Sequence, residues 1–248
     1  MSEAKSITTF LRPGTTYLPV GFSRWALEEF GRGEVAPLLQ ELRGRENSYE
    51  RVGVDRVLAI ALDLAMLRTP PQARILDVGC STGTMSLLLS KIGYRVTGID
   101  SDVVARVQGW QDATALTEAR EEHSSEHCRL LQVDARQYLE QTNETFDVAL
   151  LLSVLHHWLP GYGYTGEARF DRSEMRTLLR TLCGRVRSYL YVETPIVDEI
   201  QEMPPDPEGE FLFPGWFLAC GLATDARYIC STIATNGKPR RLYRLDLA

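Results

Sequence analysis

A glycine turn, GCSTG at Gly79–Gly83, is the segment of this sequence best suited to ligand chemistry. It lies between an apolar run, RILDV, and a helical pattern over Thr84–Ile92. Gly79 and Gly83 have no Cβ, so the backbone can turn sharply and a ligand can approach it closely. Free N–H groups at the start of the helix attract an anionic group such as a carboxylate or a phosphate. The turn therefore predicts a site for a nucleotide-like ligand.

An acidic residue at a suitable spacing makes this prediction more specific. Asp100 ends the next apolar run, RVTGID, about 20 residues after the turn. A carboxylate at the end of that strand can accept hydrogen bonds from both hydroxyls of a ribose. The glycine turn together with Asp100 at this spacing is more specific for such a ligand than the turn alone.

Two other chemistries fit parts of the same turn. A nicotinamide site needs G-x-G-x-x-G, but Ser81 and Thr84 occupy the second and third glycine positions. The turn also matches G-x-S-x-G, the nucleophile elbow of hydrolases, in which Ser81 would pair with His156 or His157. Such hydrolases place several strands before the elbow, whereas residues 1–73 have mostly helical patterns. A hydrolase is therefore the less favoured alternative.

The elements that must position these residues alternate between strands and helices. Five runs rich in Val, Ile and Leu predict buried strands over residues 74–79, 95–100, 128–134, 146–154 and 186–194. Helical patterns lie between them over Thr84–Ile92, Asp102–Glu122 and Ser173–Cys183. This alternation favours an α/β fold with a doubly wound, largely parallel sheet.

The two ends of the chain differ from this central part. Before Arg74 the pattern predicts helices over Ser23–Phe30, Val35–Arg43 and Val52–Leu67. Met203–Gly215 is a proline-rich loop in which no helix is expected. Residues 223–247 predict two strands around a turn at Asn236–Gly237, which is a strong hairpin signal.

Composition narrows the classes of partner and compartment. The 248 residues carry a net charge of −6 without a basic run, so general nucleic-acid binding is not expected. The apolar run VALLLSVL is too short to cross a bilayer. Five scattered cysteines without a CxxC pair favour a reducing cytoplasm. The histidines and carboxylates show no metal-ligand spacing, so no metal site is predicted.

At LDVGCSTG the chain resembles the class I methyltransferases that use S-adenosylmethionine. Their first motif is an acidic residue and a spacer before G-x-G-x-G, and Ser81 here replaces the middle glycine with a small residue that the family tolerates. The resemblance continues through GID, VDA (Val133–Ala135) and FDVALLLSVLHHW (Phe146–Trp158). It implies a Rossmann-like fold with a mostly parallel seven-stranded sheet and an antiparallel C-terminal hairpin. Residues 74–248 would form the S-adenosylmethionine-binding domain, and residues 1–73 a helical N-terminal cap on the substrate side.

The resemblance also implies a role for each motif in binding S-adenosylmethionine and the product S-adenosylhomocysteine. The pocket for the methionine end would be shaped by Asp77, Gly79, Cys80, Ser81 and Gly83. Asp100, next to Ser101, would hold the ribose, and Asp134, next to Ala135, would face the adenine. Ser153 would lie near the methionine amine and the sulfonium. Two alternatives stay open. Asp77 could orient the loop without touching the ligand, and Asp134 could be the N-cap of a helix over Ala135–Glu140.

A narrower resemblance rests on SVLHHW and on the tail TNGKPRRLYRLD. Both are similar to the methyltransferase domain of O-antigen chain-terminating enzymes, which methylate a terminal sugar phosphate. In that group a tyrosine and an arginine ahead of the first motif contact the carboxylate of the cofactor. Tyr17, with Arg51 or Arg56, is the corresponding candidate here, and a solvated surface arginine is the alternative.

His156 and His157 follow the fourth predicted strand, on the side from which an acceptor should approach the methyl group. A histidine can act as the general base for a hydroxyl acceptor, whereas a phosphate acceptor is already anionic and mainly needs positioning. Packing against the loop is the alternative role for this pair. The sequence therefore predicts an O-methyltransferase, monomeric or homodimeric, for a hydroxyl or phosphate of a small molecule or glycan. A non-catalytic cofactor-binding subunit is the competing hypothesis.

Overall fold

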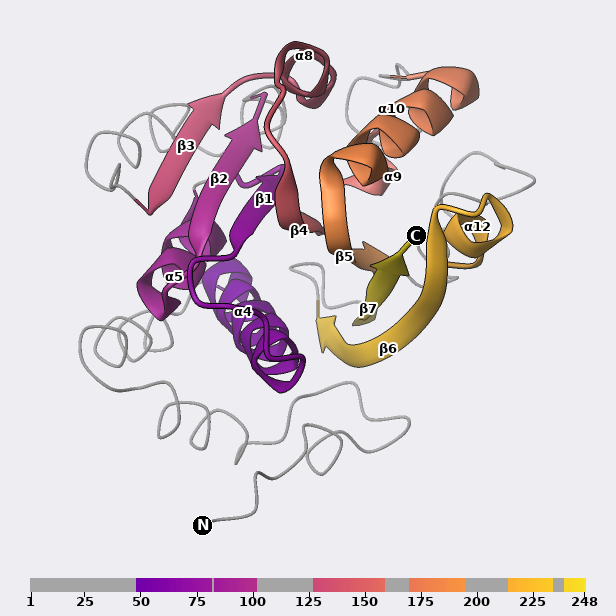
Figure 1. Ribbon diagram of the computed structural model, residues 1–248. Coiled ribbons are helices and arrows are strands. Elements are labelled where there is room, and N and C mark those ends of the chain that lie inside the picture. The colour runs from indigo at the N-terminus through magenta and orange to yellow at the C-terminus, as the bar shows by residue number, and fades with distance from the viewer. Residues whose placement is uncertain (1–47, 82, 102–126, 159–169, 195–213, 234–238) are drawn as a thin grey trace.

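The computed structural model describes residues 48–81, 83–101, 127–158, 170–194, 214–233 and 239–248 (Figure 1). These residues form a seven-stranded sheet with the strand order β3-β2-β1-β4-β5-β7-β6. The strands are β1 (Arg74–Val78), β2 (Arg95–Asp100), β3 (Cys128–Gln132), β4 (Phe146–Leu151), β5 (Val186–Thr194), β6 (Ala223–Ile233) and β7 (Pro239–Leu247). β7 runs antiparallel to β5 and β6, and the other neighbouring strands are parallel.

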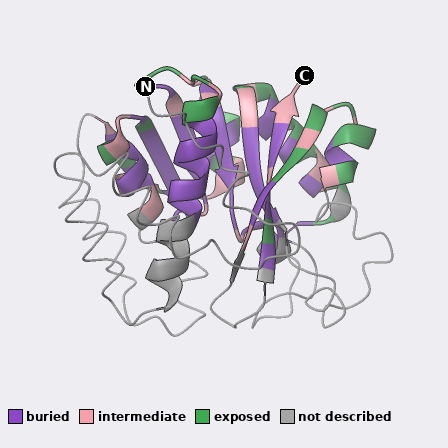
Figure 2. Ribbon diagram, turned by 90° about the horizontal axis from the view of Figure 1, so that it is seen from below, coloured by how far each residue is buried: buried purple, intermediate pink, exposed green. Residues whose placement is uncertain are grey.

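The strands bury side chains on both faces of the sheet. Along β1, Ile75 belongs to the core on one face, while Leu76 and Val78 belong to the core on the other. The same alternation places Leu150 and Leu151 of β4 in opposite cores. Side chains alternate between faces along a strand, and a largely parallel sheet is normally covered on both. Figure 2 shows this buried central layer.

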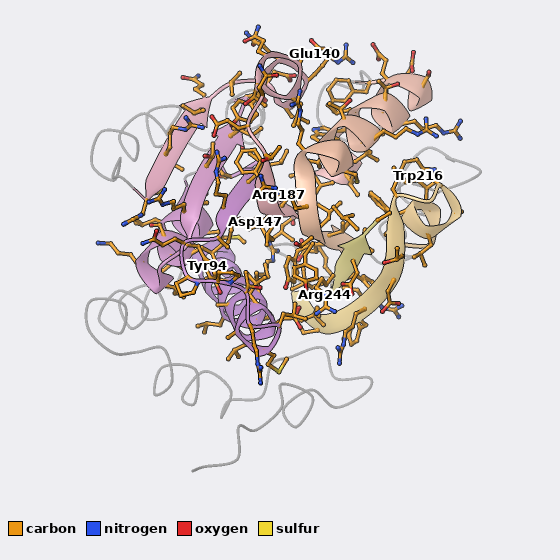
Figure 3. The ribbon with its side chains drawn as sticks, viewed as in Figure 1. Tyr94, Glu140, Asp147, Arg187, Trp216 and Arg244 are labelled. Atoms are coloured by element: carbon orange, nitrogen blue, oxygen red, sulfur yellow. The ribbon has the colours of Figure 1, made fainter. Side chains whose placement is uncertain are left out.

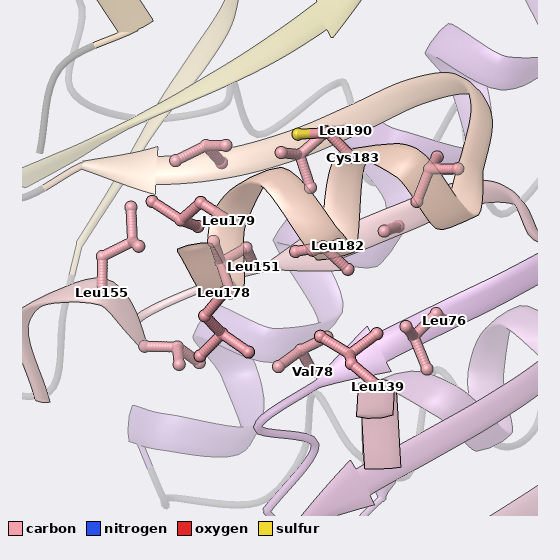
Figure 4. Packing of buried hydrophobic residues seen from close by; sticks show 14 of the residues in the cluster. Leu76, Val78, Leu139, Leu151, Leu155, Leu178, Leu179, Leu182, Cys183 and Leu190 are labelled. Carbon is pink, nitrogen blue, oxygen red and sulfur yellow. The ribbon is translucent and has the colours of Figure 1, made fainter. Parts of the chain in front are cut away.

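Helices cover the two faces. α4 (Ser48–Met66) and α5 (Thr84–Ile92) pack on one face; α8 (Ala135–Gln141), α9 (Leu155–Trp158), α10 (Arg172–Arg185) and α12 (Pro214–Ala219) contribute to the core on the other. In this second core, Leu178, Leu179 and Leu182 of α10 lie close to Leu151 of β4 and Leu190 of β5 (Figure 4). None of the helices in the described ranges is both long and apolar enough to cross a bilayer.

The predicted α/β fold is confirmed. The five predicted strands and the two strands of the C-terminal hairpin are present, although β1, β3 and β4 end earlier than predicted. The helix predicted over Val52–Leu67 is α4, and the one predicted over Ser173–Cys183 is α10. α10 begins earlier than predicted because Asp171 forms a capping box with Glu174.

One expectation about the loop 203–215 is wrong, because α12 begins inside it at Pro214. Proline is well suited to the first position of a helix, where its missing N–H has no intrahelical partner to lose. The helices predicted over 23–30, 35–43 and 102–122 and the turn at 236–237 lie outside the described residues. The division into a cap of residues 1–73 and a domain of residues 74–248 stays a prediction. α4, from the predicted cap, shares a core with β1.

The direction of the strands brings the predicted site residues to one edge of the sheet. β1, β2, β4 and β5 are parallel, so their carboxyl ends meet there. β7 begins at this edge because Arg241 pairs with Thr194 at the end of β5. Ligands of open α/β sheets bind in the crevice outside the carboxyl ends of the strands. This edge is therefore where a site is expected.

Candidate functional site

The loop after β1 has the backbone of a tight turn. Gly79, Ser81 and Gly83 have φ angles of 75°, 52° and 77°, all in the left-handed region. The N–H of Ser81 donates to Oδ2 of Asp100 at 2.8 Å, and the N–H of Gly83 donates to the carbonyl of Cys80 at 2.9 Å. The position that the resemblance assigns to a middle glycine thus keeps a glycine-like conformation although it holds serine.

Close packing by the protein itself explains the two glycines. A Cβ on Gly79 would lie 2.4 Å from Cγ2 of Val154, and one on Gly83 would lie 2.5 Å from Cδ1 of Leu130. From the sequence, the lack of a Cβ at these glycines was expected to let a ligand approach the backbone closely. In the structure, the space beside each glycine is filled by a side chain from the end of β4 or from β3. The glycines are needed for the left-handed angles and for this packing.

Asp77 lies beneath the loop and is only 3% exposed. Its carboxylate accepts a hydrogen bond of 2.7 Å from the hydroxyl of Ser86 in α5. Burial raises the pKa of Asp77 to about 6; the Ser86 hydrogen bond opposes the shift, and the charge of Asp100 adds to it. This burial supports the interpretation in which Asp77 orients the loop rather than contacting a ligand.

Cys80 is buried beside Cys128 and Leu130. Burial raises the pKa of the Cys80 thiol well above its ordinary value, and the nearby Asp77 and Asp100 carboxylates raise it further. A thiol must ionise to act as a nucleophile, so Cys80 serves the packing of the loop.

Asp100 ends β2 next to the loop, with Ser101 directly after it, and both are half-buried. The Ser81 N–H fixes the orientation of the Asp100 carboxylate. The N–H of Val133 donates to the Asp100 carbonyl at 2.8 Å, which places Asp134 beside the end of β2. A carboxylate held in this way is the group that a ribose diol requires.

Asp134 is the N-cap of α8, which begins at Ala135. Its Oδ1 accepts hydrogen bonds from the N–H of Arg136 at 2.8 Å and of Gln137 at 3.4 Å. The N-cap alternative is therefore confirmed. A contact between Asp134 and an adenine stays a prediction.

Four residues from separate segments meet at the same edge, and they are called here the Glu193 cluster: Arg56 of α4, Ser153 after β4, Glu193 of β5 and Arg240 of β7. Ser153 donates to Oε2 of Glu193 and accepts a hydrogen bond of 2.8 Å from Nη1 of Arg240. Nε of Arg56 lies 2.8 Å from Oε1 of Glu193, and the two side chains form an ion pair. Nη1 of Arg240 lies 3.8 Å from Oε2 of Glu193.

Sequence reasoning missed Glu193 and Arg240. The basic pair in the tail KPRRLYRLD drew attention only as part of a resemblance, and the glutamate ends a strand that otherwise looks apolar. Arg56 was a candidate for binding the carboxylate of a cofactor, and the structure pairs it with Glu193.

The remaining predicted residues are placed in part. His156 and His157 lie in α9, which begins two residues after Ser153. Their side chains are outside the described part of the structure, as is that of Arg51 in α4. Tyr17 lies outside the described residues altogether. Within the described ranges, no group of three or more histidine, cysteine or carboxylate side chains could hold a metal ion.

The model of a family described as a methyltransferase domain matches residues 31–160, just over half of the chain. A search of curated proteins found no match.

Solved structures share the fold at low sequence identity. The bifunctional kinase-methyltransferase WbdD is 22% identical, with a TM-score of 0.54 over 83% of this chain and 41% of WbdD, so the chain spans less than half of that protein. The N-methyltransferase NodS from Bradyrhizobium japonicum, in complex with S-adenosylhomocysteine, is 18% identical, with a TM-score of 0.53 over 91% of this chain and 98% of NodS. Magnesium protoporphyrin IX methyltransferase from Synechocystis PCC 6803 is 17% identical, with a TM-score of 0.51 over 92% and 94% of the two chains.

Proposed function

The chain belongs to the methyltransferase-domain family, and we propose that it is an S-adenosylmethionine-dependent methyltransferase whose acceptor is an oxygen atom of a small molecule or glycan. One observation carries the proposal. α9, which contains His156 and His157, begins at Leu155, two residues after Ser153, at the carboxyl end of β4. The residue after Ser153, Val154, packs on Gly79 of the loop that we assign to the donor.

The donor site that we propose uses the carboxyl edge of the sheet. The loop Gly79–Gly83 and the start of α5 would face the methionine end, because Gly83, the N-cap of α5, offers no side chain to cap the helix. Asp100, with Ser101, would accept the hydroxyls of the ribose. Asp134, with Ala135, would lie at the adenine, and its capping of α8 fixes its carboxylate. Tyr17 and Arg51 are proposed for the carboxylate of the methionine.

Support for an oxygen acceptor comes from the two histidines of α9, next to the proposed donor site. S-adenosylmethionine, when bound, supplies an electrophilic methyl group on a sulfonium. The protein has to hold the acceptor oxygen in line with that methyl group and to exclude competing geometries. For a hydroxyl acceptor, a histidine of α9 would accept the proton that the hydroxyl loses as the carbon–oxygen bond forms and the carbon–sulfur bond breaks, with S-adenosylhomocysteine as the leaving group. A phosphate oxygen would need no base.

The hydrolase alternative for Ser81 loses its support. The turn follows the first strand in the described part of the chain, and the family match covers it. We further infer a cytoplasmic monomer or homodimer that does not bind nucleic acid generally. The five free cysteines and the net charge of −6 support this inference.

Methyl transfer to a panel of acceptors tests the proposal. The chain is incubated with S-adenosylmethionine labelled in the methyl group and with a sugar, a phosphate monoester, a phenol, a carboxylate and an amine, and products are identified by mass spectrometry. An O-methylated product is expected. Methylation of the amine alone would overturn the oxygen assignment. Binding of S-adenosylhomocysteine in calorimetry without transfer to any acceptor or to a cell extract would favour the non-catalytic subunit.

Two sets of variants test the assigned residues. Asp100→Asn should weaken binding of S-adenosylhomocysteine on the order of tenfold or more, because it removes one charged acceptor from the ribose. Asp225→Asn, an exposed carboxylate on β6, is the matched control and should bind as the wild type does. His156→Asn and His157→Asn, made separately, identify the base: one of them should lower kcat about 10²- to 10⁴-fold with a hydroxyl acceptor.

A further inference from the structure

The charged side chains of the Glu193 cluster are almost completely buried, unlike those of surface ion pairs. The side chains of Arg56, Glu193 and Arg240 are 6%, 0% and 7% exposed. They come from α4, β5 and β7. Glu193 and Arg240 form hydrogen bonds with Ser153 in the turn after β4, and Arg56 pairs with Glu193. Burying charged side chains this deeply costs free energy unless they are paired. Surface solubility therefore does not account for these three charges, and a structural role is expected.

The hydroxyl of Ser153 is already engaged by this cluster. A serine hydroxyl has one proton to donate and two lone pairs to accept with. The proton of Ser153 goes to Glu193, and Arg240 occupies one lone pair. The hydroxyl is therefore not a donor to a ligand or a nucleophile. What the cluster fixes is the conformation of Ser153 itself.

That conformation is unusual. Ser153 has a φ angle of 56°, in the left-handed region that residues with a Cβ rarely adopt. Such residues persist where the surrounding structure over-determines them. Ser153 lies in the turn between β4 and α9, and the side chain of the next residue, Val154, packs on Gly79.

We propose that Glu193 is a positioning residue for methyl transfer: held by Arg56 and Arg240, it fixes Ser153 in the left-handed conformation and so keeps Val154 packed on Gly79 of the donor loop. Glu193 does not touch the donor. If Ser153 relaxed to an extended conformation, Val154 would leave Gly79 and the donor loop would lose one wall. Affinity for the donor would then fall, and so would the alignment of the methyl group with the acceptor.

A second buried cluster provides a control for a merely stabilising role. In the Asp63 cluster, which consists of Asp63, Tyr191, Arg244 and Asp246, a carboxylate of α4 accepts hydrogen bonds from β5 and β7. It joins the same three elements as the Glu193 cluster, and Asp63 and Arg244 are equally buried. None of its residues has a positive φ angle in the described structure, and the hydrogen bonds that define the cluster join its residues only to one another. Loss of this cluster should destabilise the fold without changing the donor site.

The test measures binding of S-adenosylhomocysteine by calorimetry and thermal unfolding for the full chain. The variants are Glu193→Gln, Ser153→Ala, Ser153→Gly, the double variant Glu193→Gln/Ser153→Gly, and Asp63→Asn as the control. Glu193→Gln and Ser153→Ala should weaken binding on the order of tenfold, which corresponds to the usual preference against a left-handed residue that has a Cβ. Ser153→Gly should bind S-adenosylhomocysteine within about threefold of the wild type, because glycine adopts a left-handed angle without support from Glu193 and Arg240. The double variant should recover most of the affinity that Glu193→Gln loses.

Each contrary result has a distinct meaning. Equal losses in Ser153→Gly and Ser153→Ala would overturn the proposal, since the hydroxyl itself would then be required. Wild-type binding by both Glu193→Gln and Ser153→Ala would overturn it as well, as would an equal loss of affinity in Asp63→Asn. The inference rests on the donor site proposed above, and the wild-type titration tests that site separately: a wild type that binds neither S-adenosylmethionine nor S-adenosylhomocysteine would overturn the site itself. If Glu193→Gln fails to fold, the two Ser153 variants still decide the question.

Discussion

The Glu193 and Asp63 clusters both join α4, β5 and β7 through a buried carboxylate and an arginine, but they differ in what the buried groups hold in place. In the Asp63 cluster, the Asp63 carboxylate accepts from Tyr191 at 2.7 Å and from Nη1 of Arg244 at 2.8 and 3.1 Å. Nε of Arg244 also donates to Asp246 at 2.7 Å, and Figure 3 shows Arg244 on the side of the hairpin that faces α4. Every group there holds another group of the same cluster. The Glu193 cluster instead holds a serine in a strained conformation.

The two clusters also differ in their position along β5 and β7. Residues 191 and 193 of β5 point to the same face, as do 240 and 244 of β7, so the two clusters lie along one line between α4 and the hairpin. Only the Glu193 cluster reaches the carboxyl edge, where the donor loop lies. A change in the Asp63 cluster should therefore be seen in stability, and a change near the Glu193 cluster in ligand affinity as well.

Asp63→Asn should have the largest effect on stability. It leaves Arg244 buried with one carboxylate fewer, and breaking a buried ion pair costs about 3–5 kcal/mol. The free energy of unfolding is measured by urea denaturation at pH 7, with Asp225→Asn as the surface control. Affinity for S-adenosylhomocysteine should not change. A loss of stability no greater than that of the control would show that the Asp246 carboxylate alone satisfies Arg244.

Gly79→Ala tests the packing between the donor loop and Val154. The new Cβ would be placed 2.4 Å from Cγ2 of Val154, and the φ angle of 75° disfavours any side chain there. The left-handed angle and the overpacking together should cost about 2–4 kcal/mol and should also weaken donor binding.

Gly221 provides a matched control for this variant. It has a φ angle of 67°, and a Cβ there would meet nothing within 4 Å. Gly221→Ala should therefore show the cost of the angle alone, about 1–2 kcal/mol, without an effect on affinity. Equal losses of stability in the two variants would mean that Val154 moves away freely, and the wall that it forms would then be unimportant.

The sequence could predict the sheet because its signal is local. Runs such as FDVALLL are apolar on both faces, so a buried parallel strand is the simplest structure that satisfies them. The turn at Gly79–Gly83 and its position beside Asp100 could also be predicted, because a turn and the end of the next strand have a fixed spacing. α12 was missed because a proline in a loop-like segment can equally begin a helix.

The Glu193 cluster could not be predicted in the same way. Its members come from α4, the end of β4, β5 and β7, and they meet only because Glu193 pairs with Leu242 in the β5–β7 register. A shift of that register by one residue would turn Arg240 to the opposite face of the sheet. Nothing in the local sequence sets this register, and nothing there indicates that Ser153 is left-handed.

Asp77→Asn tests a third buried carboxylate. In the described structure, the partner of Asp77 is the hydroxyl of Ser86 rather than a guanidinium. Its pKa is about 6 in the folded chain, raised mainly by burial from an ordinary value of 3.8. The folded state therefore binds the proton more tightly than the unfolded state does. As a result, Asp77 makes the wild type lose stability as the pH rises from about 4 to 6, with no further loss above that range.

The asparagine variant lacks this titration. Its stability relative to the wild type should rise between pH 4 and pH 6 by about 1–3 kcal/mol and then stay level. Urea denaturation at closely spaced pH values checks the curve. A difference that stays constant with pH would show that Asp77 ionises as easily in the folded chain as in the unfolded chain.

Tyr191→Phe should have the smallest effect. Burial raises the pKa of the Tyr191 hydroxyl well above its ordinary value, and the Asp63 charge raises it further, so the group is a neutral donor at any ordinary pH. Removing it leaves the Asp63 carboxylate paired with Arg244, and a hydrogen bond to a carboxylate that keeps its counter-ion contributes about 1 kcal/mol. Urea denaturation should show a loss of that size, with unchanged affinity for S-adenosylhomocysteine. A loss as large as that of Asp63→Asn would mean that the hydroxyl, rather than the guanidinium, holds α4 against the sheet.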